Sequence, residues 1–252
     1  MAEHKAKPRS RAAGIAFRIG FLAVLAILLA LGTWQVQRLQ WKEALIAERD
    51  ARQKMPPVSV DALDKGRTGT PTEPVEFRPV VDQGTFDNAH EMFFLATQDG
   101  EPGFHVYVPF HLTSGRVILV NRGFVPEAFR DQASRKSGLI EGRTTLTGLA
   151  REQLFVKPGS LLPDNDIKAN LFFWKDLDAM AGMAGLDRAK VVPFFIDAGP
   201  NADPGLLPKG GVTIFDLPNN HLQYALTWYG LALALIGVAI ASRIKSKRHP
   251  EA

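Results

Sequence analysis

The chain has 252 residues, of which 46% are hydrophobic, a formal net charge of +4 and no cysteine. The absence of cysteine excludes disulfides, thiolate zinc sites and covalent attachment of c-type haem. Residues 1–18 and 243–252 hold nine of the 30 basic residues but only two of the 26 acidic ones. Because these basic residues flank apolar stretches instead of covering a folded face, no nucleic-acid partner is expected.

The first expected element is a transmembrane helix at residues 15–36. Residues 19–34 carry no charge, and Arg18 can extend its side chain toward the lipid head groups. No Gly or Pro follows the apolar run until Pro56, so we expect the helix to continue to about residue 54. A cleaved signal peptide is the alternative. An uncleaved anchor is favoured because the run is long and no good A-x-A site precedes the polar turn.

The polar middle of the chain is expected to form one β-rich domain. Residues 58–74 contain two Gly and two Pro and are expected to form a loop. Six later segments are rich in β-branched and aromatic residues and lie between turn formers: 75–86, 91–97, 103–110, 116–122, 143–150 and 191–197. Consecutive hairpins predict an antiparallel sheet, with a short amphipathic helix at 175–183 against it. Pro193 is expected to restrict its strand to a sheet edge, and residues 212–215 are expected to add a last strand.

The second apolar stretch, residues 222–242, has 21 residues without a charge. As a helix it is about 32 Å long, which matches a hydrocarbon core of roughly 30 Å. Asn219 or Asn220 is the expected N-cap. Small residues at a spacing of four and three are expected to let the first helix approach closely: Gly230, Ala234, Gly237 and Ala241.

Together these elements predict an α+β membrane protein, in which two transmembrane helices flank an exported antiparallel β-rich domain with a short helix. Because Lys/Arg-rich flanks mark the cytoplasmic side, both termini are expected inside and the domain outside. The parts in chain order are a basic tail (1–14), transmembrane helix (15–36), β-rich domain (55–218), transmembrane helix (219–242) and basic tail (243–252).

His221, at the start of the second apolar stretch, is a candidate metal or haem ligand. The first turn of a helix disfavours the imidazolium, and neutral imidazole is the form that binds a metal. Tyr224 and Trp228 follow at i+3 and i+7, on the same helix face. The alternative, which spacing alone favours, is a polar interface residue beside the aromatic belt of any membrane protein.

On the first helix, Trp34, Arg38 and Trp41 recur at i, i+4 and i+7. The expected topology places them at the same membrane face as His221. Two indoles and a cation beside a neutral histidine are suited to hold a flat macrocycle, with Arg38 meeting a carboxylate. An interfacial anchor, with Arg38 extended toward the head groups, is the alternative.

Two further polar positions lie in the expected sheet. His90 and His111 fall near one another across a hairpin, but two histidines without a third ligand make a poor metal site. Arg122 ends a strand in a turn where Gly123 can supply a positive φ, so Arg122 can face an acidic partner or a propionate. The alternative is a structural arginine that satisfies local carbonyls. No HExxH motif, phosphate loop, nucleophile elbow or paired-carboxylate pattern occurs, so no enzyme is expected.

Four separated motifs, in this order, resemble the Surfeit locus protein one family. They are Leu31-Gly32-Thr33-Trp34-Gln35 with Arg38 and Trp41-Lys42; Glu76-Phe77-Arg78-Pro79-Val80; Val120-Asn121-Arg122-Gly123-Phe124-Val125-Pro126; and Asn220-His221-Leu222-Gln223-Tyr224 with Thr227-Trp228-Tyr229-Gly230. The resemblance runs from the first apolar stretch to the second and leaves out the tails.

The resemblance implies a multi-pass protein of the bacterial inner membrane, with a periplasmic domain, that assembles cytochrome c oxidase. It implies binding of haem a as cargo and help with its insertion into oxidase subunit I. Oxidase subunit I, haem a synthase and membrane lipid are the implied partners. His221 is the implied iron ligand, and the further implied contacts are Trp34, Arg38, Arg122, Tyr224 and Trp228. A cofactor-free membrane scaffold that stabilises an oxidase assembly intermediate is the alternative.

Overall fold

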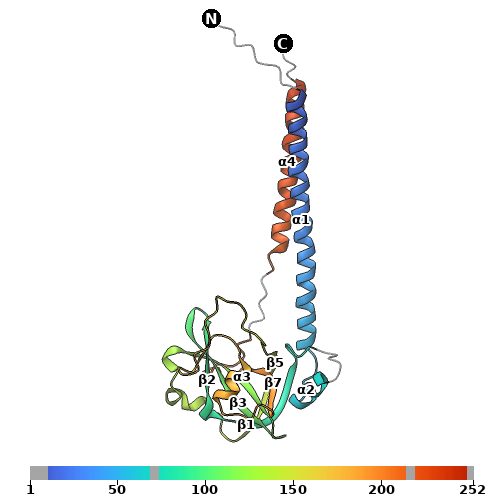
Figure 1. Cartoon of the computed structure of the whole chain (residues 1–252). Coiled ribbons are helices and arrows are strands. Elements are labelled where there is room, and N and C mark those ends of the chain that lie inside the picture. The colour runs from blue at the N-terminus through green and yellow to red at the C-terminus, as the bar shows by residue number, and fades with distance from the viewer. Residues whose placement is uncertain (1–10, 69–73, 214–218, 249–252) are drawn as a thin grey trace. The chain divides into compact units, whose positions relative to one another are not determined.

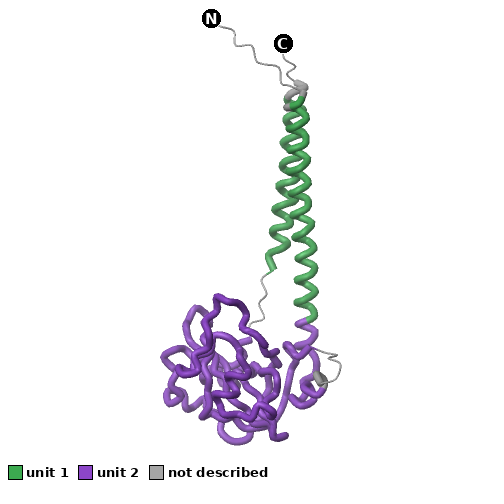
Figure 2. Tube along the Cα trace, viewed as in Figure 1, with its two compact units in different colours: residues 1–48, 216–252 green, residues 49–215 purple. Residues whose placement is uncertain are grey.

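The computed structural model describes residues 11–68, 74–213 and 219–248. The chain divides into two compact units, residues 1–48 with 216–252 and residues 49–215 (Figure 2). Most of the first basic tail and the end of the second lie outside the described residues.

The first unit contains most of one long helix, α1 (Arg11–Gln53), and all of a second, α4 (His221–Arg248), both labelled in Figure 1. Both are long and apolar enough to cross a membrane, over Gly14–Gln53 and His221–Lys245. The helix expected to continue to about residue 54 ends at Gln53, because no Gly or Pro interrupts it after the apolar run. The start of α4 at His221 fits Asn220 as N-cap, since the Asn220 carbonyl accepts the amide of Tyr224.

The contact between α1 and α4 follows a stripe that repeats about every 3.5 residues, as in paired helices with a left-handed supercoil. The more buried positions of α1 are Phe21, Leu25, Leu28, Gly32, Gln35 and Leu39. Those of α4 are His221, Ala225, Trp228, Ala232, Leu235 and Ala239, with Ala225 and Ala232 only 2% exposed. The stripe is therefore apolar except at Gln35 and His221.

The expected small-residue contact face of α4 is wrong. A Cβ built on Gly230 or Gly237 would meet no heavy atom within 4 Å. Gly230 lies two residues before Ala232, roughly 200° away around the helix, so it faces away from α1. The closely approached glycine is Gly32 of α1.

The second unit is built on a seven-stranded sheet with the order β1-β5-β7-β4-β3-β2-β6. The strands are β1 (Pro79–Phe86), β2 (Met92–Gln98), β3 (Glu101–Leu112), β4 (Val117–Pro126), β5 (Arg143–Glu152), β6 (Leu171–Phe172) and β7 (Val191–Ala198). Because β1 pairs with both β5 and β3, five strands form a closed ring, and β2 and β6 extend it. The six expected strand segments all overlap observed strands.

Two details of the expected sheet are wrong. The sheet is mixed, because β4 pairs with β7 and β2 with β6 in parallel. The strand with Pro193 is central, between β5 and β4. Pro193 is tolerated there because the β4 ladder is irregular between its pairs with Val191 and Phe195, and pairing with β5 begins at Phe194.

Short helices complete this unit: α2 (Val60–Thr68), α3 (Leu177–Met183), η1 (Asn88–His90), η2 (Glu127–Phe129) and η3 (Gln132–Gly138). The expected loop at 58–74 is wrong over α2, where Val60 and Leu63 are buried in the core and Ser59 Oγ accepts the amide of Ala62. α3 is the expected short helix, and its cap Asp176 accepts the amide of Ala179. Of the expected strand at 212–215, residues 212 and 213 form no strand and the others lie outside the described residues.

The core follows the two faces of the strands. Phe194 and Ile196 of β7 join the cluster inside the ring, whereas Phe195 packs with Leu177 and Met180 of α3 on the other face. This alternation is the period-two pattern of a strand buried on both sides.

Candidate functional site

His221 is held by a polar contact between the two long helices. Its Nδ1 lies 2.7 Å from Oε1 of Gln35. An amide oxygen only accepts, so Nδ1 carries the proton and donates it to Gln35. The lone pair then lies on Nε2, which makes that nitrogen the atom able to bind a metal.

Gln35 was given no role by sequence reasoning, although it lies inside a quoted motif. The signal that was missed is the position of Gln35 around the helix. Gln35 follows Gly32 by three residues and Leu28 by seven, so it continues an apolar stripe of α1 with a polar side chain. A polar residue on such a stripe requires a partner from the facing helix. His221 is that partner.

A second contact joins the same helix pair, eight residues after His221 on α4 and two residues before Gln35 on α1. The hydroxyl of Tyr229 lies 3.1 Å from Thr33 Oγ1, and Thr33 donates its own proton to the carbonyl of Leu29. Tyr229 is therefore the donor to Thr33. A Cβ on Gly32 would lie 2.8 Å from the ring of Tyr229, so a larger residue would require the ring to move.

The other predicted residues of the long helices lie around this pair. Trp34 and Tyr224 are 50% and 54% exposed, and Trp228 is half-buried on the contact stripe. The guanidinium carbon of Arg38 lies 4.5 Å from the centre of the Trp41 ring. Arg38 therefore lies over an exposed indole.

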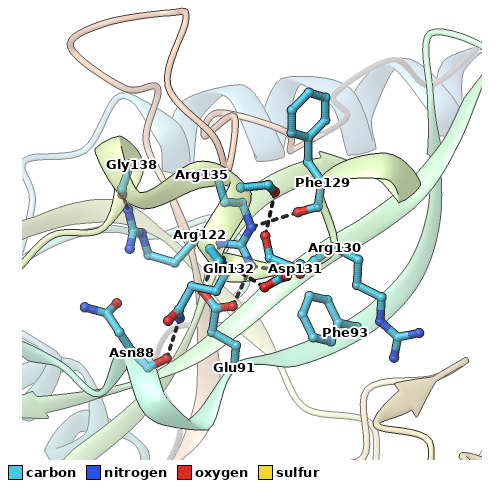
Figure 3. Close-up of polar contacts among 12 residues, drawn as sticks. Asn88, Glu91, Phe93, Arg122, Phe129, Arg130, Asp131, Gln132, Arg135 and Gly138 are labelled. Atoms are coloured by element: carbon cyan, nitrogen blue, oxygen red, sulfur yellow. Dashed lines mark hydrogen bonds and ion pairs between the residues drawn. The ribbon is translucent and has the colours of Figure 1, made fainter.

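Arg122 belongs to the sheet unit and is 5% exposed. It donates to the carbonyl of Gly138 over 3.0 Å (Figure 3). Its guanidinium also lies over the ring of Phe86. The pKa of Arg122 is lowered to about 10, mainly because the side chain is buried; Glu91 opposes this change and the nearby Arg135 adds to it. These contacts favour the structural alternative for Arg122.

The neighbouring Arg135 forms a buried ion pair with Glu91, in which both guanidinium nitrogens donate to the carboxylate (Figure 3). Its Nε donates to the carbonyl of Phe129, and Gln132 donates to the carbonyl of Asn88. The cluster joins η2 and η3 to the start of β2. It is a structural network, and it includes η3, whose Gly138 carbonyl accepts the hydrogen bond from Arg122.

Gly123 explains the rest of the Asn121-Arg122-Gly123 motif. Its φ is +125°, and a Cβ would lie 2.0 Å from the carbonyl oxygen of Lys209. Phe124 and Lys209 exchange two backbone hydrogen bonds directly beside it. The glycine therefore lets the segment around Lys209 pair with β4.

Asn121 donates to Asp197, a buried carboxylate that also accepts from Arg151 and Thr213. Burial would raise the pKa of Asp197, but Lys175, Arg151 and these hydrogen bonds hold the pKa below its usual value. Asp197 therefore stays ionised and ties β4, β5 and β7 together.

His90 and His111 come together around one carboxylate. Asp87 lies 2.7 Å from Nδ1 of His90 and 3.9 Å from Nε2 of His111, and both histidines are about half exposed. Within residues 11–68, 74–213 and 219–248, no group of three His, Cys, Asp or Glu side chains could hold a metal ion.

A model of the SURF1 family matches residues 22–233 of the chain. The chain is also 37% identical to Surfeit locus protein 1 of Rattus norvegicus over 231 residues, which are 84% of this chain and 71% of that protein. The chain belongs to the SURF1 family. Other members include Surfeit locus protein 1 of Homo sapiens, 38% identical over 81% of this chain and 70% of that protein. The protein of Takifugu rubripes is 33% identical over 89% of this chain and 95% of its own length.

The family inferred from four motifs is thereby confirmed. The SURF1 family match includes the Gln35–His221 pair and the turn at Gly123. It therefore spans parts of both compact units.

Proposed function

We propose that this protein is an assembly factor for cytochrome c oxidase that binds haem a and assists its insertion into oxidase subunit I. Membership of the SURF1 family supports an assembly role. The two long apolar helices support a membrane anchor, with both termini in the cytoplasm and the sheet unit in the periplasm of a bacterial cell. It would act as a binding protein that exchanges its cargo with subunit I and haem a synthase.

The residues around His221 fit a haem. The contact that carries the proposal is the 2.7 Å hydrogen bond from His221 to Gln35, which leaves Nε2 as the basic nitrogen. Trp34 and Tyr224 offer exposed aromatic surface for a macrocycle. Arg38 offers a guanidinium to a propionate.

The proposed mechanism is protective holding. A haem with a long apolar tail is insoluble in water and redox-active, so a carrier must keep the tail in lipid and hold the iron at the interface. His221, in the first turn of α4, would bind the iron, and apolar residues further along the helices would face the tail. Haem a itself supplies the redox chemistry once it is in the oxidase.

The test is the absorption spectrum of protein purified from cells that make haem a. Wild type should carry haem, and His221→Ala should lose it. His90→Ala is the matched control, since His90 pairs with Asp87 in the other unit. Equal haem content in wild type and His221→Ala would remove His221 as the ligand.

A cofactor-free scaffold is the second candidate. The observation that favours it is that the His221–Gln35 hydrogen bond already accounts for both side chains as a helix–helix contact. A scaffold would capture oxidase subunit I and be colourless when purified. His221→Ala would then weaken the capture without changing any spectrum.

A further inference from the structure

A second feature of the helix pair lies far from His221. A groove of about 550 Å³ opens between α1 and α4 near the ends of the chain. It begins at Leu235, 14 residues after His221, which is about 21 Å along the helix. Its walls are apolar and include Phe17, Phe21 and Leu22 from α1 and Leu235, Ile236 and Ala239 from α4.

Two arginines line this groove, one from each helix. Arg18 and Arg243 are both exposed, and no acidic residue is among the lining residues. Neither arginine has an ion pair with a residue that the structure describes. The groove therefore combines an apolar channel with two guanidinium groups that no described residue neutralises.

The position of the charges separates this arrangement from a general basic flank. Lys245 is also exposed on α4, but it lies two residues beyond Arg243, roughly 200° around the helix, and does not line the groove. Arg18 and Arg243 are far apart in the sequence and come together only because the helices pair.

We propose that this groove binds a phospholipid with a net negative head group in the cytoplasmic leaflet. A guanidinium donates two parallel hydrogen bonds to phosphate oxygens, so Arg18 and Arg243 would hold the head-group phosphate between them. One acyl chain would follow the apolar walls. The inference rests on the membrane placement in the proposed function, but not on haem binding.

The experiment uses the full chain, purified in a mild detergent and mixed with equal amounts of phosphatidylglycerol and phosphatidylcholine. Retained lipid is then counted by native mass spectrometry. Wild type should retain phosphatidylglycerol in preference. Arg18→Gln or Arg243→Gln should reduce the preference about tenfold, the effect of losing charge-assisted hydrogen bonds.

Lys245→Gln is the matched control, because it removes the same charge from the same helix outside the groove. It should keep the wild-type preference to within about twofold. Val238→Trp fills the groove from an exposed position and should reduce retention without changing charge. Equal losses in Arg243→Gln and Lys245→Gln, or no preference in wild type, would overturn the proposal.

Other occupants give different results. If a second copy of the chain fills the groove, Val238→Trp should lower the proportion of dimer and leave lipid preference unchanged, which would overturn the lipid site.

Haem content separates the two proposals. A protein that retains phosphatidylglycerol selectively but never carries haem removes the proposed haem role and leaves the lipid site. Recovery of the protein outside the membrane fraction removes both.

Discussion

Gln35 and His221 are separated by 186 residues in the chain, yet their side chains meet at 2.7 Å. The amide oxygen of Gln35 accepts from Nδ1 and so determines which imidazole nitrogen remains basic. In the proposed haem site, Gln35 would act on the iron only through His221, as a positioning residue.

The first prediction concerns this hydrogen bond. Gln35→Leu should lower the haem affinity of the purified protein about tenfold or more, as the loss of a partner to a metal-binding histidine does. Gln35→Glu keeps an acceptor and should retain most of the affinity. Gln37→Leu is an exposed control on the same helix. If haem titration gives the same affinity for Gln35→Leu and wild type, Gln35 does not act through His221.

The second prediction compares two glycines of the helix pair. Gly32→Ala places a Cβ 2.8 Å from the Tyr229 ring and should destabilise the pair by about 1–3 kcal/mol. Gly230→Ala meets open space and should stabilise α4 by up to about 1 kcal/mol through helix propensity. Unfolding in a mixed-micelle titration measures both. Effects of the same sign would contradict the observed contact face.

The third prediction concerns Gly123. Gly123→Ala combines a positive φ with a clash against the carbonyl of Lys209, and should cost about 3 kcal/mol or more. Gly100 also has a positive φ, but a Cβ there meets open space, so Gly100→Ala should cost only about 1 kcal/mol. Urea unfolding of the full chain provides the comparison. A cost no larger at Gly123 than at Gly100 would show that the β4 segment can move away from Lys209.

The fourth prediction concerns pH. The folded pKa of Asp197 is lowered, so its ionised form contributes stability above about pH 4, and this is lost as pH falls through the folded pKa. Asp197→Asn should be less stable than wild type at pH 7, and the difference should shrink toward pH 3. Glu101→Gln, at an exposed carboxylate, should keep the wild-type profile. A constant difference from pH 7 to pH 3 would show that the charge of Asp197 is not what stabilises the sheet.

The strands were predictable because their apolar residues lie between clear turn formers, and the helix pair because its apolar runs are long. The place of β7 was not predictable. A proline usually marks an edge, and only the irregular register opposite Pro193 makes it tolerable in the centre. α2 was missed because Gly66 and the nearby prolines resemble a loop, whereas Val60 and Leu63 hold it in the core.

The candidate site was predictable in part. The position of His221 at the start of α4 followed from the edge of an apolar run. Finding its partner Gln35 required knowing which faces of the two helices are in contact. The small residues of α4 predicted the wrong face. Gly230 and Gly237 form a regular spacing, but burial follows Ala225 and Ala232. The burial of Arg122 could not be read from its turn motif, because its contacts are with the carbonyl of Gly138 and the ring of Phe86, which lie outside that motif.

The ring of strands closes only when β7 takes its place between β5 and β4. β7 is the last strand of the domain to be synthesised among the described residues, so a nascent chain that ends before Val191 leaves the edges of β4 and β5 without their partner. Pairing that joins distant segments is slow, and unpaired strand edges promote aggregation. Nearly the whole domain must therefore be synthesised before the ring can close, and the edges of β4 and β5 stay unpaired until β7 is available.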